Sequence, residues 1–360
     1  SRGRRYPEPD HPYRNPFQRD RDRIVHARAF RRLEAKTQVF TPGLSDHFRN
    51  RLTHTIEVSQ IARTAAGVLQ LDEDLTEALA LAHDIGHPPF AHAGEEELNR
   101  QMQRFGERFE HNLHALRIVE SFEHRYAAFP GLNLTFEVRE GIIKHSRDWS
   151  IDEYPELREY LLDQRPPLEA QVIDLADEIA YTTADFDDGL ESGLLALEEI
   201  RSRVPLFECF FRIAEQEYPG ARAKLKFNEA IKRMLDRFVT DFIGETARRL
   251  RERKIDSVEA VRRSPERLAS LGAEAEAERR ECKQFLYERL YYHTQLMPEK
   301  QHAERVITEL FTHWVNHPET LPRGYREKAG ESAARVVCDY IAGMTDNYIL
   351  AQYAAVIAGE

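Results

Sequence analysis

Apolar residues along this chain recur at steps of three and four, which is the repeat of one face of an α-helix. The clearest example is residues 51–69, where one face consists of His54, Val58, Ile61, Ala62 and Ala65. Similar spacing covers residues 76–83, 111–122, 138–144, 167–188 and 335–353. No stretch sustains the alternation of apolar and polar residues that is typical of a half-buried strand. The pattern therefore predicts an all-α protein.

Glycines, prolines and changes in composition divide this helical pattern. A turn is expected at residues 41–43, and Gly189 is expected to end the helix that starts at Pro167. Residues near the N-terminus are rich in Arg, Pro and Tyr and have no periodicity, so we interpret them as an arm that is either frayed or ordered against a neighbouring subunit. The expected regions are an arm at residues 1–16, a core at residues 17–190, and a C-terminal helical region at residues 191–360 that packs on the core.

Residues 82–95 combine three histidines and two carboxylates with a break in the helical pattern. Adjacent His83 and Asp84 cannot share one face of a regular helix, because neighbours are about 100° apart. Gly86 and the proline pair that follows change the backbone direction, so that both side chains can reach one metal ion. The alternative for a bare His-Asp pair is the cap of a buried helix. Imidazole and carboxylate together are typical ligands of divalent cations.

Two residues outside this segment extend the candidate metal site. His54 lies on the inward face of its predicted helix, where a histidine is otherwise a satisfied core residue. Asp177 lies on an otherwise inward stripe, where a carboxylate is costly unless it is paired or bound. Four ligands, namely His54, His83, Asp84 and Asp177, leave positions open for water and substrate oxygens on a metal that prefers six. This arrangement is typical of a hydrolytic site.

Composition narrows the class of protein further. A net charge of -11 and a pI near 5.8 argue against a surface covered with nucleic-acid contacts. The three cysteines are far apart and odd in number, so they predict neither a zinc site nor a disulfide framework, and a reducing cytoplasm is expected. No apolar run approaches the roughly 20 residues of a membrane span. Phosphate-loop and dinucleotide-binding motifs do not occur either. We therefore expect a soluble cytoplasmic protein without a membrane partner.

The candidate metal set resembles that of the HD-domain metal-dependent phosphohydrolases. Longer motifs are similar to one branch, the deoxynucleoside triphosphate triphosphohydrolases, which includes bacterial dGTPase-like proteins. The matching residues are 28–33 (RAFRRL), 36–39 (KTQV), 51–54 (RLTH), 82–95 (AHDIGHPPFAHAGE), 174–181 (DLADEIAY) and 337–346 (VCDYIAGMTD). The resemblance spans most of the chain and is weakest between residues 192 and 331. It implies an HD-domain helical bundle with an additional C-terminal helical region.

The resemblance implies hydrolysis of a dNTP to a deoxynucleoside and inorganic triphosphate, by attack at the α-phosphorus. The implied metal ligands are His54, His83, Asp84 and Asp177. Two histidines and two aspartates suit Mn²⁺ or Mg²⁺, and Fe, Co, Ni or Zn are also compatible with this donor set. The resemblance further implies a homo-oligomer, with hexamers among the relatives, and activation by a second dNTP at a subunit interface.

Catalytic and substrate-binding residues are implied in the same way. His92 would protonate the leaving 5′ oxygen, and Glu95, three residues further along the same predicted helix, would orient it. His87 and His111 would contact α-phosphate oxygens. The implied substrate-binding residues are Arg51 and Lys144 for the phosphates, Tyr181 and Asp185 for the deoxyribose, and Gln38 with Val39 for the sugar and base.

Two other functions fit parts of the sequence. One is an HD-domain phosphodiesterase or phosphatase that acts on another nucleotide phosphate ester. Arg51, Tyr181 and Asp185 favour the triphosphohydrolase over this alternative, because a monoester needs no extended phosphate and sugar contacts. The other is a non-enzymatic protein that binds nucleotides or nucleic acid, for which the arginine-rich residues 21–32 offer phosphate contacts. A complete metal set and the His92 and Glu95 pair argue against it.

Overall fold

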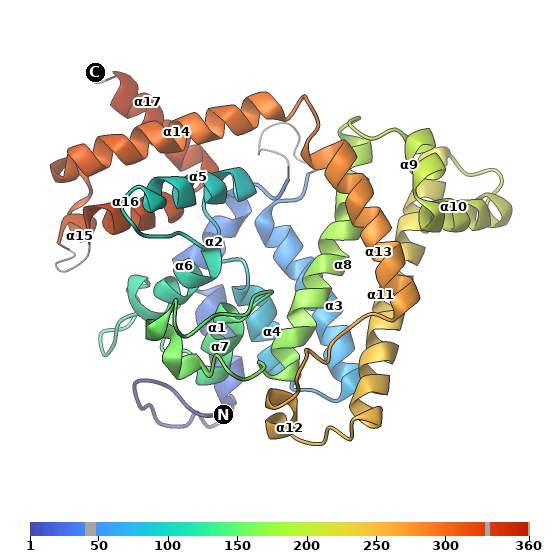
Figure 1. Ribbon diagram of the computed structural model, residues 1–360, viewed down its shortest axis with the longest axis horizontal. Coiled ribbons are helices and arrows are strands. Elements are labelled where there is room, and N and C mark those ends of the chain that lie inside the picture. The colour runs from blue at the N-terminus through green and yellow to red at the C-terminus, as the bar shows by residue number, and fades with distance from the viewer. Residues whose placement is uncertain (40–47, 328–331, 359–360) are drawn as a thin grey trace. The chain divides into compact units, whose positions relative to one another are not determined.

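The computed structural model describes residues 1–39, 48–327 and 332–358, and the regular structure in these ranges is helical (Figure 1). Within these residues, β-structure is limited to isolated bridges, for example between Thr37 and Asn50. The predicted all-α class is confirmed. The turn predicted at residues 41–43 lies outside the described residues.

The helices form two compact units, and each unit is assembled from stretches that are separate in sequence. The first unit comprises Ser1–Ile56, Leu81–Lys144 and Met297–Glu360, and the second comprises Glu57–Ala80 and His145–Leu296. The division of the chain after residues 16 and 190 stays a prediction.

Each unit has its own set of helices. Those of the first are α1 (Pro16–Val25), α2 (Arg28–Arg32), α5 (Ala91–Gln103), α6 (His111–Arg117), α7 (Phe136–Ile143), α14 (Met297–Asn316), α15 (Arg323–Arg326), α16 (Ala333–Ala342) and α17 (Asp346–Ala358). Those of the second are α8 (Leu168–Glu191), α9 (Leu197–Arg203), α10 (Pro205–Glu217), α11 (Ala223–Glu252), α12 (Val258–Arg262) and α13 (Ala273–Leu286). Residues of α3 (Arg51–Leu69) and α4 (Glu73–Ala82) are divided between the two units. Short helical turns are η1 (Leu33–Ala35), η2 (Ile118–Phe122), η3 (Pro155–Tyr160), η4 (Tyr287–Tyr291) and η5 (Pro318–Thr320).

In the first unit, one apolar cluster joins α5, α14 and α16, which lie side by side (Figure 1). On α14, Val306 and Leu310 are fully buried because apolar residues recur there at three and four positions. They belong to the same cluster as Leu98 and Met102 of α5 and Val337 of α16. The helices near the C-terminus therefore complete the core around the helix that follows the predicted metal motif.

In the second unit, α8 packs against α11 and α13, and α11 packs against α10. Phe227, Phe238 and Phe242 on α11 are fully buried. Phe186 of α8 stacks on Phe285 of α13, with ring centroids 5.7 Å apart. These aromatic contacts fix the position of α8 within this unit, and α8 carries the predicted metal ligand Asp177.

Two of the differences from the predicted helix boundaries have a structural cause. Gly189 lies inside α8, which continues to Glu191. A Cβ atom at this position would lie 2.5 Å from the Cδ1 atom of Leu195, so glycine here makes room for a neighbouring side chain instead of ending the helix. The single helix expected at residues 335–353 is divided into α16 and α17, because the hydroxyl of Thr345 accepts a hydrogen bond from the N–H of Tyr348 and starts a new helix.

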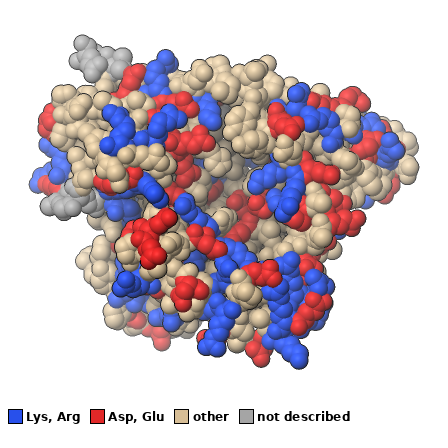
Figure 2. All heavy atoms as spheres, viewed as in Figure 1, with Lys and Arg blue, Asp and Glu red and all other residues tan. Residues whose placement is uncertain are grey.

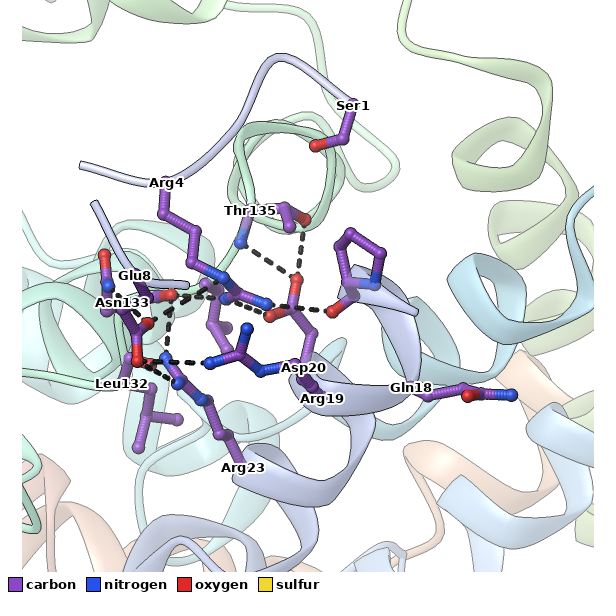
Figure 3. Close-up of polar contacts among 12 residues, drawn as sticks. Ser1, Arg4, Glu8, Gln18, Arg19, Asp20, Arg23, Leu132, Asn133 and Thr135 are labelled. Carbon is purple, nitrogen blue, oxygen red and sulfur yellow. Dashed lines mark hydrogen bonds and ion pairs between the residues drawn. The ribbon is translucent and has the colours of Figure 1, made fainter. Parts of the chain in front are cut away.

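The N-terminal segment is ordered against its own unit (Figure 3). Arg4 pairs with the buried carboxylate of Asp20 on α1. That carboxylate also accepts hydrogen bonds from the backbone N–H and the hydroxyl of Thr135, at 2.9 and 2.6 Å. Glu8 pairs with Arg23 at 2.7 Å. The arm therefore needs no neighbouring subunit to be ordered.

Candidate active site

The segment after α4 turns sharply and places the predicted metal motif in the interior. His83 and Asp84 follow directly on the end of α4, and both are buried. Gly86 permits this turn, since a Cβ atom there would lie 2.0 Å from the carbonyl oxygen of His111. Phe90, immediately before α5, has a φ of 64° in the left-handed region. The loop is thus closely packed against α6 and locally strained.

Two imidazoles and one carboxylate of the predicted metal set lie together in the first unit. His54 and His83 offer ligand nitrogens within 4.8 Å of each other. Asp84 Oδ1 lies 3.5 Å from His83 Nε2. Burial raises the pKa of the Asp84 carboxyl, but the charges of His83, Arg51 and His87 outweigh burial and hold this pKa well below its usual value. Two buried imidazoles beside an ionised carboxylate fit the donor preference of a divalent cation.

Arg51 provides fixed positive charge beside these ligands. It occupies the first position of α3, one turn before His54, and its Nη1 atom lies 2.8 Å from Asp84 Oδ2. Its Nε atom is buried and has no hydrogen-bond partner among the described residues. A buried guanidinium with an unused N–H group is well suited to donate a hydrogen bond to a phosphate oxygen.

A second cluster consists of His87, Glu95 and His111, whose ligand atoms lie within 4.8 Å of one another. Glu95 Oε1 accepts a hydrogen bond from the backbone N–H of His111 at 3.0 Å and lies 2.8 Å from its Nδ1 atom. The His87 and His111 rings stack with centroids 4.0 Å apart. His87 also reaches Asp84 Oδ1, at 3.1 Å from its Nε2 atom.

The stacked rings of this cluster differ in the direction in which their pKa values are shifted. Burial lowers the pKa of His111, but the carboxylate of Glu95 outweighs burial and raises this pKa above its usual value. Burial, followed by the charges of Arg51 and His111, holds the pKa of His87 well below its usual value. Of the two stacked imidazoles, His111 therefore holds a proton more readily than His87.

Glu95 has a different partner from the one that its spacing predicts. His92 and Glu95 were expected to pair because they lie three residues apart on α5. The structure directs the Glu95 carboxylate to His111 instead, because the backbone N–H groups at the start of α6 have no partner within the helix. His92 is exposed, and its ring centroid lies 6.1 Å from that of His87.

The other predicted substrate-binding residues of the first unit differ in whether their polar groups already have a partner. Lys144 is buried at the end of α7, with its Nζ atom 2.9 Å from Glu140 Oε1, so its charge is balanced within the protein. Gln38 and Val39 are half-buried, and Gln38 Oε1 has no hydrogen-bond partner among the described residues. An unused amide oxygen remains available for a ligand.

In the second unit, Asp177, Tyr181 and Asp185 follow each other at steps of four along one stripe of α8, as the sequence predicts. The hydroxyl of Tyr291 donates a hydrogen bond to Asp185. Lys283 Nζ lies 5.7 Å from the centroid of the Tyr181 ring. Sequence reasoning does not identify Tyr291 or Lys283, because they belong to the weakest part of the resemblance and meet α8 only through tertiary packing.

His145 is a further residue that the sequence prediction does not include. Its Nδ1 atom lies 2.8 Å from Asp174 and its Nε2 atom 3.7 Å from Asp177, all within the second unit. Burial lowers the pKa of His145, but these two carboxylates outweigh burial and raise it to about 10. His145 therefore lies between Asp174 and Asp177 and pairs with both carboxylates.

The arginines near the N-terminus are largely engaged within the chain. Arg23 donates hydrogen bonds to the carbonyl oxygen of Leu132 and to Glu8, and Arg14 pairs with Asp22. On the face drawn in Figure 2, basic and acidic side chains are interspersed. Nucleic-acid binding stays a prediction.

Comparison with known proteins places these features in a family. The HD domain matches residues 51–182, and the phosphohydrolase-associated domain matches residues 269–355. The helical fold and these matches define an HD-domain phosphohydrolase.

Relatives of this chain cover nearly its whole length. They include the deoxyguanosinetriphosphate triphosphohydrolase-like proteins of Bordetella pertussis (45% identical over 357 residues, 98% of this chain and 92% of the relative), Azoarcus sp. (46% over 359 residues, 99% and 94%) and Caulobacter vibrioides (43% over 369 residues, 98% and 93%). The chain belongs to the family of deoxyguanosinetriphosphate triphosphohydrolase-like proteins. Among the described helices, none has the length and apolar character needed to span a membrane.

Proposed function

We propose that this protein hydrolyses deoxynucleoside triphosphates to a deoxynucleoside and inorganic triphosphate, by attack of water at the α-phosphorus. One observation carries the proposal. In a chain that matches triphosphohydrolase-like proteins along its length, His111 is stacked on His87, which in turn contacts Asp84. In the proposal, His111 with its raised pKa is the proton donor, His87 is the neutral imidazole and Asp84 is the ionised carboxylate, a combination that suits phosphate-ester hydrolysis.

His54, His83, Asp84 and Asp177 are the residues proposed to hold a divalent cation, most plainly Mn²⁺ or Mg²⁺. Support comes from the buried imidazoles of His54 and His83 beside the ionised Asp84, and from the motif that contains Asp177. When bound, such a cation lowers the pKa of water and neutralises phosphate charge.

The histidine cluster is proposed to bind the α-phosphate and to supply the proton for the leaving group. Protonated His111 donates a hydrogen bond to an α-phosphate oxygen, and Glu95 holds the proton on it. His92 is exposed and therefore accessible to substrate, and it protonates the leaving 5′ oxygen. Arg51 contributes a fixed charge for the phosphate chain.

The remaining contacts are proposed to select the substrate. Tyr181 packs against the deoxyribose and Asp185 accepts from its 3′-hydroxyl, with Tyr291 holding the Asp185 carboxylate in place. Gln38 and Val39 contact the sugar and base. We further propose a homo-oligomer, such as a hexamer, that binds an effector dNTP at a subunit interface.

An HD-domain phosphodiesterase or phosphatase that acts on another nucleotide phosphate ester is the second candidate. The observation that favours it is the ion pair between Lys144 and Glu140, which removes one cation from the set expected to hold three phosphates. The two candidates differ in the phosphorus that is attacked, so product analysis separates them.

The test is product analysis with each dNTP, alone and in mixtures, in Mn²⁺ or Mg²⁺. The proposal expects a deoxynucleoside and intact triphosphate, and turnover confined to mixtures would identify effector activation. Release of orthophosphate or pyrophosphate would reject attack at the α-phosphorus and favour the second candidate.

Metal dependence is tested on the same preparation. Chelation with EDTA should abolish turnover and lower the melting temperature, because a ligand that binds only the folded state stabilises it by mass action. Mn²⁺ should restore both properties in the wild type. Asp177→Ala should keep its helical circular dichroism but gain neither turnover nor thermal stability from Mn²⁺. Full turnover by Asp177→Ala would remove this residue from the site.

A further inference from the structure

The loop that connects His87 to α5 adopts backbone φ angles that are unfavourable for the residues it contains. Phe90 and Ala91 both have positive φ angles, of 64° and 52°. A non-glycine residue in the left-handed region is strained and persists only where the surroundings enforce it. The loop nevertheless leads directly from His87 to His92 and Glu95, so its conformation decides where these side chains lie.

Asp346, the first residue of α17, is one of the groups that enforce this conformation. It is buried, and its Oδ1 atom accepts a hydrogen bond from the backbone N–H of Phe90 at 3.1 Å. Its Oδ2 atom accepts from the backbone N–H of Thr37 at 2.9 Å and from the Thr37 hydroxyl. One carboxylate therefore ties the start of α17 to the loop and to the segment that leads into Gln38.

Lys36 supports the same loop from the other end. Its Nζ atom donates hydrogen bonds to the carbonyl oxygens of His87 and of Ala342, the last residue of α16. The side chain is buried, and burial followed by the charge of Arg32 lowers the Lys36 pKa to about 7, although Asp346 raises it. Burial of an amine is costly unless its N–H groups form hydrogen bonds. The two carbonyl oxygens therefore offset part of the cost of burying Lys36.

We propose that Asp346 and Lys36 are positioning residues that hold the loop from His87 to Phe90 in its reactive conformation. The inference rests on the proposed function, because it takes His87, His92 and Glu95 as catalytic. All the residues involved belong to the first unit. Through Asp346 and Ala342, the phosphohydrolase-associated segment at residues 269–355 thus completes the active site of the HD domain.

The chain offers a matched control for this proposal. Asp20 is also a buried carboxylate of the first unit, and it accepts from the N–H and hydroxyl of Thr135 as Asp346 does from Thr37 (Figure 3). Asp20 also pairs with Arg4 of the N-terminal arm, whereas Asp346 also accepts a hydrogen bond from Phe90, in the loop that follows His87. Equivalent substitutions at Asp346 and Asp20 therefore distinguish a loss of protein stability from a displacement of the loop that carries His87.

The experiment compares Asp346→Asn with Asp20→Asn, and the milder Thr37→Val with Thr135→Val, in the full chain with Mn²⁺. Melting temperature, kcat and KM are measured for the substrate that the wild type turns over. We expect Asp346→Asn to lower kcat by about 10–100-fold, as for a small displacement of catalytic groups, with KM changed by less than about threefold. Thr37→Val should act in the same direction, and Thr37→Ser, which keeps both donors, should restore kcat.

Asp20→Asn and Thr135→Val should lower the melting temperature but leave kcat within about twofold of the wild type. Wild-type kcat in both Asp346→Asn and Thr37→Val would overturn the inference, as would equal losses of kcat at the two matched sites. A wild type that hydrolyses a phosphate ester without releasing triphosphate would reject the proposed function alone, because the comparison of kcat can then be made on that ester.

Discussion

At the scale of single residues, the site depends on two imidazoles that are in contact but have pKa values shifted in opposite directions. Two stacked imidazolium ions would repel each other, so a proton on one ring disfavours a proton on the other. The carboxylate of Glu95 favours the proton on His111, whereas burial, followed by the charge of Arg51, disfavours a proton on His87. The position of one carboxylate therefore assigns the roles of both histidines.

This assignment predicts a pH dependence for Glu95→Gln. The pKa of His111 is raised above its usual value, and activity that needs this proton is lost as the pH rises through that pKa. Removing the carboxylate charge lowers the pKa, so the alkaline limb of the kcat profile should move to lower pH, and kcat above neutral pH should fall by about 10²-fold. The matched control is Glu96→Gln, an exposed neighbour on α5 that should leave the profile unchanged. An unchanged profile for Glu95→Gln would assign the proton elsewhere.

At the scale of elements, two glycines differ in how closely other atoms approach them. Gly86 allows the loop after α4 to touch the start of α6, because a Cβ atom would lie 2.0 Å from the His111 carbonyl oxygen and 2.5 Å from the Ala115 nitrogen. Gly244 lies inside α11, where a Cβ atom would have no neighbour within 4 Å outside the helix.

These surroundings predict opposite effects of alanine. Gly86→Ala should reduce the free energy of unfolding by about 1–3 kcal/mol or more, because the atoms that it meets belong to the backbone and cannot move aside. Gly244→Ala should increase it by about 1 kcal/mol, since alanine is the better helix former. Urea denaturation of both variants measures this difference. Equal effects of the two substitutions would contradict the close approach at Gly86.

At the scale of the whole molecule, the two compact units are not consecutive in sequence. The first unit needs Met297–Glu360 in addition to its N-terminal stretches. The apolar faces of α14 and α16 bury Leu98 and Met102 of α5. The helix that carries His92 and Glu95 therefore relies on residues roughly two hundred positions away for its core.

A fragment of residues 1–190 should consequently fail to fold on its own. It lacks α14 and α16, so Leu98 and Met102 would be exposed. The free energy lost with this apolar core exceeds the small net free energy that stabilises a folded domain. We expect a weak near-ultraviolet circular dichroism signal and no sharp urea transition, in contrast to the full chain. A cooperative transition of the fragment would instead support the expected boundary after residue 190.

Much of this protein is determined locally and can therefore be predicted from the sequence. Periodicity predicts the all-α class, the bounds of α3 and the start of α6, because the helical repeat depends on residues only three or four apart. The same local signal places Asp177, Tyr181 and Asp185 on one stripe of α8. The spacing of His54 and the turn after His83 likewise indicate which residue types are candidates for a metal site.

Only the tertiary structure decides which groups meet across helices. It assigns Glu95 to His111 instead of His92, balances Lys144 with Glu140, and brings Asp346 to the backbone of Phe90. These contacts join residues from different helices, and no local repeat specifies them. Charge states follow the same rule, because a pKa depends on burial and on every nearby charge. The sequence by itself determined the helices and the candidate ligands, and the packing of those helices decided the partners and protonation states on which the chemistry depends.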